Sequence, residues 1–247
     1  MVISSQGKRM NSRSRTALLA GFLLLPPIFA IGAVGAAPVR AVDPAKLQNE
    51  EFQYRWQLRN FLGTIAGLFL PNRGEGSLTF KALGNGHLQS ELTITSDVAK
   101  QGEYFRYGSE MDPRTMQPIR AWSSYSWRGE TKSKSSAIDQ TGVLDIASGI
   151  YSIRQNPPDK ARRMEIWSDG TIYPVVVIPV GIETRQMKGG RKIEVRHFSI
   201  RGIDVPDRGR WKGKLDLWLA RDDVATPVEI VLSRNLADVR LELTTLQ

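Results

Sequence analysis

The sequence predicts a mainly β protein, with an antiparallel, strongly curved sheet or open β-barrel of about ten strands around one central helix. Three observations lead to this fold. Apolar and polar residues alternate with a period of two along most of the chain, turn-forming residues separate these runs, and a single stretch has helical periodicity. No shift in composition marks a second boundary, so residues 42–247 are expected to form a single β-rich domain.

Residues 51–58 show the alternation most clearly, with Phe52, Tyr54, Trp56 and Leu58 on one side of the expected strand. Glycine, proline, asparagine and aspartate form turns between such runs at Gly84-Asn85-Gly86, Asp112-Pro113, Asp169-Gly170 and Gly189-Gly190. Further strands are expected at 78–82, 88–94, 119–127, 131–135, 164–168, 173–185, 192–200, 214–221, 228–233 and 239–245.

The helical stretch spans residues 143–154. Val143, Ile146, Ile150 and Ile153 repeat at helical spacing, and a second apolar stripe lies beside them. Two apolar stripes predict a helix that is well buried against the sheet and ends before Pro157-Pro158. Asp145 and Ser148, on the polar side, are expected to cap the start of the helix.

The first 41 residues have the order of a secretory signal peptide. Four basic residues precede an uncharged run at 16–37, and small residues follow it, so that cleavage after Ala36 or after Ala41 fits the pattern. An uncleaved anchor is the alternative, because the run reaches the roughly 20 residues that span a bilayer. Pro26-Pro27 in the run favours cleavage. Both alternatives place the rest of the chain outside the cytoplasm.

Charge and cysteine content narrow the class of protein. The net charge is +9, but residues 1–41 hold five basic and no acidic residues, which leaves 29 basic against 25 acidic residues in the body. We therefore expect no nucleic-acid partner. An exported chain with no cysteine is typical of a bacterial periplasm. His87 and His197 are not part of a hydrolase or zinc motif, so we expect neither a cofactor, a metal site nor an enzyme.

Five short sequence motifs follow one another along the chain, at residues 52–56, 144–154, 181–192, 217–230 and 239–243. Together they resemble the exported bacterial proteins grouped as domain of unknown function 3108, from about Glu50 to the C-terminus. This resemblance implies a fold similar in outline to the lipoprotein carriers, an open β-barrel wrapped around a helix. It implies a cavity and no particular reaction. Residues 60–71 depart from the family pattern, which has a short polar connection there, so the first hairpin is in doubt.

The candidate ligand-binding residues come from apolar and aromatic positions. Phe61, Leu68 and Phe69 belong to an uncharged segment that predicts a lid over a lipid cavity or a contact with a membrane or partner. A buried plug at one end of the barrel is the alternative. Tyr125 and Trp127 share one face of an expected strand, where they either contact an acyl chain or sugar or pack in the core.

The set of candidate ligand-binding residues is completed by Tyr151, Arg154 and Trp218. Arg154 either orients an anionic headgroup or forms an ion pair with Glu183. The sequence therefore predicts a non-catalytic periplasmic protein that carries a lipid or glycolipid. The alternative is an envelope scaffold or assembly factor with a filled barrel, which binds a protein and no small ligand.

Overall fold

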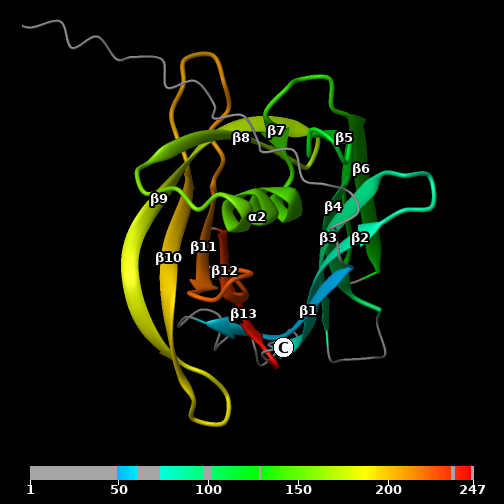
Figure 1. The fold of residues 1–247 in the computed structure, drawn as a ribbon. Helices are drawn as coiled ribbons and strands as arrows, with labels where there is room; N and C mark the ends of the chain where they lie inside the picture. The colour runs from blue at the N-terminus through cyan, green and yellow to red at the C-terminus, as the bar shows by residue number, and fades with distance from the viewer. Residues whose placement is uncertain (1–48, 60–72, 97–101, 128, 235–236, 246–247) are drawn as a thin grey trace, which may run out of the picture. The chain divides into compact units, whose positions relative to one another are not determined.

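The computed structural model describes residues 49–59, 73–96, 102–127, 129–234 and 237–245. These residues form one mainly antiparallel sheet and the helix α2, Ile146–Gln155 (Figure 1). The described strands are β1 (Glu50–Arg59), β2 (Arg73–Ala82), β3 (Leu88–Ser96), β4 (Tyr104–Met111), β5 (Pro118–Trp127), β6 (Glu130–Ala137), β7 (Val143–Leu144), β8 (Arg162–Ser168), β9 (Thr171–Gln186), β10 (Lys192–Gly202), β11 (Gly213–Ala220), β12 (Pro227–Arg234) and β13 (Ala237–Leu243).

The strand order in the sheet is β6-β5-β4-β3-β2-β1-β13-β12-β11-β10-β9-β8-β7. Neighbours pair antiparallel except β7 and β8, which are parallel, and the pairing of β1 with β13 joins the two halves of the sheet. The end strands β6 and β7 are not paired with each other, so this part of the chain forms a curved sheet that hydrogen bonds do not close. The right-handed twist of strands curves a sheet of this size, and Figure 1 shows it bending around α2.

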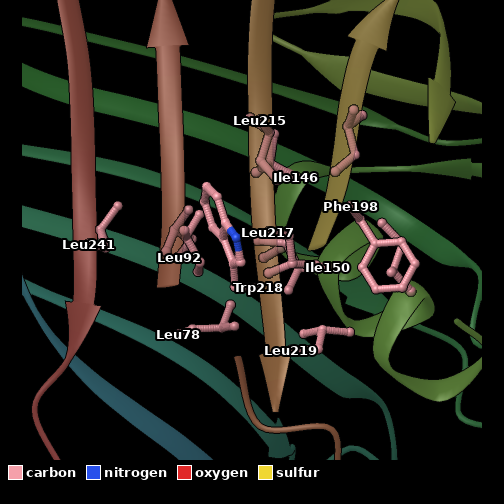
Figure 2. Packing of buried hydrophobic residues seen from close by; sticks show 14 of the residues in the cluster. Leu78, Leu92, Ile146, Ile150, Phe198, Leu215, Leu217, Trp218, Leu219 and Leu241 are labelled. Atoms are coloured by element: carbon pink, nitrogen blue, oxygen red, sulfur yellow. The ribbon is translucent and has the colours of Figure 1, made fainter. Parts of the chain in front are cut away.

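The register of the strands aligns apolar side chains across the concave face. Trp56, Leu241, Ile230 and Leu217 are successive cross-strand neighbours on β1, β13, β12 and β11. Ile150 of α2 belongs to the same buried cluster (Figure 2). Burial of this continuous apolar surface is the main force that holds the helix against the sheet.

The helix confirms its predicted cap and its burial, but the predicted start at Val143 is wrong. Asp145 is the N-cap, and Asn156 is the C-cap directly before the two prolines. Val143 and Leu144 form β7, which pairs with β8. The Val143 side chain packs against Ala121 of β5 and Trp167 of β8, so this small cluster bridges the two ends of the sheet.

The structure confirms a mainly β, antiparallel and strongly curved sheet, but the expected number of about ten strands is too low for the thirteen that it describes. The prediction missed β7 because it is only two residues long, and it missed β4 because β4 has polar or small residues at packed positions. Ser109 of β4 is fully buried, and Gly108 lies so close to Trp122 that a Cβ atom would come within 2.8 Å of the ring. Hydropathy alone does not show these positions.

Helix α2 has ten residues, and none of the helices in the described ranges is long and apolar enough to span a membrane.

Candidate functional site

A buried carboxyl joins the start of α2 to the concave face. Asp145 accepts hydrogen bonds from the backbone N–H groups of Ala147 and Ser148, at 2.9 and 3.1 Å. It also accepts one from the Ser109 hydroxyl of β4 at 2.6 Å, with Ser90 of β3 at 3.5 Å. Burial raises the pKa of Asp145, and these hydrogen bonds oppose the rise. The cap therefore also fixes the helix to two strands.

Arg154 anchors the other end of α2. Its Nη1 and Nη2 atoms lie 2.9 and 3.2 Å from the two carboxylate oxygens of Glu50 in β1. Its Nε and Nη2 atoms donate to the carbonyl oxygens of Ala225 and Val224 at 3.1 and 3.0 Å. The predicted ion pair with Glu183 is therefore wrong, because the end of α2 faces β1 and the β11–β12 turn. This set of acceptors occupies the guanidinium fork and leaves it poorly placed for an anionic headgroup.

The cavity next to Arg154 is small. The Tyr151 ring stacks on Phe80, with centroids 3.8 Å apart, and burial raises the pKa of Tyr151 to about 12. The cavity has a volume of about 10 Å³, which is room for about one water molecule. It is lined by Phe52, Leu78, Thr79, Phe80, Ser90, Ala147, Tyr151 and Arg154.

Among the four predicted ligand-binding residues whose side chains the structure describes, Tyr151 and Arg154 lie together, with the Arg154 guanidinium 5.7 Å from the Tyr151 ring. Tyr125 lies on β5 against Phe105, with ring centroids 5.9 Å apart and the Lys132 ammonium 5.9 Å from its ring. Trp218 is buried and follows Leu217 in β11, so its side chain points to the other, convex face of the sheet. Trp127 is the last residue of β5, but its side chain is not among those that the structure describes. Phe61, Leu68 and Phe69 lie outside the described residues.

Trp218 belongs to a charged cluster on that convex face that sequence reasoning did not find. It stacks on His197, its direct cross-strand neighbour in β10, with ring centroids 4.2 Å apart. The two ring nitrogens of His197 lie 2.9 Å from Glu183 and 3.3 Å from Asp216. Carboxylates only accept, so both bonds form together only when the imidazole carries a proton on each nitrogen.

Asp216 is a buried acid of this cluster. Burial alone would raise its pKa, but hydrogen bonds from His197, Lys214 and Ser199 outweigh burial and hold the pKa at about 2. The Lys214 ammonium lies 2.5 Å from its second oxygen. The cluster continues to buried Glu229, which Arg240 contacts at 2.7 Å.

The pairing of charges in this cluster favours a structural role. Asp216 lies beside Lys214 of its own strand, and Glu229 lies beside Arg240 of β13. In the described part of the chain, no group of three or more acidic and histidine side chains is placed to hold a metal ion. Glu183, His197 and Trp218 lie on three different strands, so only the cross-strand register of two hairpins would have revealed that they meet.

The two edges of the sheet differ sharply. Edge strand β7 has two residues, both buried, whereas β6 has eight residues that are exposed except for half-buried Ser136. The β6 sequence, Glu-Thr-Lys-Ser-Lys-Ser-Ser-Ala, has no large apolar side chain. Among the residues that the structure describes, one edge is therefore covered and the other has no neighbouring strand.

Comparison with known proteins leaves the family open. No family model and no curated protein matches the chain, so the resemblance to domain of unknown function 3108 stays a prediction. One similar solved structure is the β-barrel-like protein of domain of unknown function DUF1849 from Brucella abortus, at 9% identity and a TM-score of 0.45, covering 80% of this chain and 96% of that one. Another is LprF from Mycobacterium bovis, at 12% identity and a TM-score of 0.24, covering 79% and 84%.

Proposed function

We propose that the protein is a non-catalytic scaffold or assembly factor of the bacterial cell envelope that binds a protein partner. The observation that carries the proposal is the small size of the cavity that the described residues form between α2 and the concave face. The cavity beside Tyr151 and Arg154 measures about 10 Å³, whereas pockets for small-molecule ligands measure roughly 300 to 1,000 Å³. An acyl chain does not fit into this cavity.

The anchoring of α2 also disfavours a carrier that opens beneath the helix. Moving the helix away from the sheet would break the hydrogen bond between Asp145 and Ser109 and the ion pair between Arg154 and Glu50. Each group would then have to be resolvated or left unpaired, at a cost of about 1 to 3 kcal/mol per buried polar group. A helix that is anchored at both ends over a small cavity fits a protein that presents its outer surface and edges.

The envelope location rests on the N-terminal sequence. Residues 1–41 have the pattern of an export signal, and the chain has no cysteine. Partner binding is supported by the eight-residue open edge at β6, since an unpaired edge strand offers a row of backbone hydrogen-bonding groups.

The test is native mass spectrometry, with organic extraction, of the protein exported to a bacterial periplasm. We expect a mass without lipid, unchanged after incubation with phosphatidylethanolamine–phosphatidylglycerol vesicles, and a stoichiometric complex with a second protein under gentle purification. A bacterial lipid carrier prepared in parallel shows that the method retains lipids. A stoichiometric lipid on the chain would contradict the scaffold and restore the carrier predicted from the sequence.

A further inference from the structure

The exposed edge of β6 has a defined set of free backbone groups. Just beyond β6, the Ile138 N–H donates to the Ile119 carbonyl oxygen at 2.9 Å, and this pair continues the β5–β6 register of Arg120 with Ala137. In an antiparallel ladder, hydrogen-bonded pairs alternate with non-bonded pairs. The even-numbered residues of β6 therefore bond to β5, and Thr131, Ser133 and Ser135 direct their N–H and C=O groups away from the sheet.

Strand β6 carries two lysines and one acid. Lys132 and Lys134 share the concave face of the strand, and Arg120 reaches the Ser135 hydroxyl from β5 at 2.9 Å. The single acid of β6, Glu130, lies 3.5 Å from the Lys132 ammonium. An incoming strand with acidic side chains on the concave side would place them opposite the two lysines.

We propose that β6 is the docking edge for an extended, acidic peptide segment of a partner protein, which adds to the sheet as a further strand. This inference rests on the proposed scaffold function and names the partner's chemistry. Main-chain hydrogen bonds to Thr131, Ser133 and Ser135 supply affinity, and the lysines select for acidic side chains. The other edge takes no strand, because β7 is two buried residues long.

A second copy of this chain is the less favourable occupant. Antiparallel pairing of two β6 strands about a two-fold axis would bring Lys132 and Lys134 of both copies onto one face. Like charges directly opposite each other destabilise a strand pair. Edge lysines protect a sheet from unspecific pairing for the same reason, and an acidic strand is the type of partner that they do not repel.

The experiment uses fluorescence anisotropy with the full-length protein and a labelled nine-residue peptide that alternates Glu and Thr. The matched control probe alternates Lys and Thr. We expect the acidic peptide to bind at least about tenfold more tightly than the basic one, with a difference that shrinks at high salt. Equal binding of the two peptides, or none by the acidic one, would overturn the proposal.

Two protein variants locate the site. Ser133→Pro removes one outward N–H and leaves the bonds to β5 intact, since proline is tolerated at a free edge. It should weaken binding of the acidic peptide about tenfold relative to the matched Ser133→Ala, the effect of roughly one lost backbone hydrogen bond. The double change Lys132→Glu with Lys134→Glu should invert the preference, so that the basic peptide binds more tightly.

Changes in the probe keep the test valid if Ser133→Pro misfolds. An acidic peptide with N-methylated residues along one backbone edge loses strand pairing but keeps its charge, and it should lose binding to the unchanged protein. Retained binding would show simple charge attraction and contradict strand addition. A protein free of lipid that ignores both peptides would overturn the β6 site and leave the scaffold function standing, whereas bound lipid would contradict the scaffold itself.

Discussion

Arg154 at the end of α2 forms a two-point ion pair with Glu50 at the start of β1, across 104 positions of the chain. The Arg154 side chain is 5% exposed and that of Glu50 is 27% exposed, so water screens this pair only partly. The same guanidinium lies 4.7 Å from the Phe52 ring. One side chain thus ties the helix, the first strand and the β11–β12 turn together.

Replacing Arg154 should therefore destabilise the fold strongly. Arg154→Ala leaves the Glu50 carboxylate and two carbonyl oxygens without their donor, and we expect a loss of about 3 to 5 kcal/mol in the free energy of unfolding. Arg154→Lys should recover only part of this, because one ammonium cannot replace the guanidinium fork. Urea unfolding followed by circular dichroism measures both. A loss below about 0.5 kcal/mol for Arg154→Ala, typical of a surface position, would show that the anchor is not structural.

A charge at the centre of α2 should unfold the domain. Ile150 is 1% exposed within the main apolar cluster, so Ile150→Asp places an unpaired carboxylate there or forces it to take up a proton. The matched control is Ile182→Asp on β9, where the isoleucine is 59% exposed. Thermal melts should show no cooperative transition for the first variant and a nearly unchanged one for the second. Equal melting temperatures would mean that α2 is not central to the core.

The cap at Asp145 should give a stability difference that depends on pH. Burial raises its pKa above the ordinary 3.8 in the folded state, so the contribution of this carboxyl is largest at low pH and falls as the pH rises above about 3.8. The advantage of the wild type over Asp145→Asn should thus be greater at pH 4 than at pH 7. Asp145→Ala should cost about 1 to 3 kcal/mol, because it removes the cap and an acceptor of Ser109. Urea titrations at both pH values test this, and an advantage that grows with pH would show the assigned direction to be wrong.

Asp216 should show the opposite dependence. Its folded pKa of about 2 lies below the ordinary 3.8, so its contribution is complete above about pH 5 and disappears as the pH falls through 4 towards 2. Asp216→Asn should cost about 1 to 2 kcal/mol near neutral pH, after allowance for solvent screening, and little at pH 2. The measurement is the unfolding free energy of both proteins from pH 2 to pH 7. A cost that stays constant over this range would exclude a charged interaction at Asp216.

Local chemistry determined much of the fold. The alternation at residues 51–58 predicted a strand with one buried face, and β1 buries Phe52, Tyr54 and Trp56 as expected. The turns at Gly84-Asn85-Gly86 and Gly189-Gly190 connect consecutive strands, and Asp145 caps the helix. These features follow from backbone geometry and side-chain periodicity over a few residues, so the sequence alone was enough to predict them.

Only the tertiary structure decided which residues from distant segments meet. Arg154 faces Glu50 and not Glu183, and His197 lies on Trp218, because strand order and register place them there. Buried Ser109 donates its hydrogen bond to Asp145, which comes from the helix 36 positions further along the chain. Which edge stays open was likewise settled by strand order, since β6 and β7 are edges only in the assembled sheet. Period-two patterning determines which face of a strand is apolar, whereas pairing across a sheet depends on the free energy of the whole packed core.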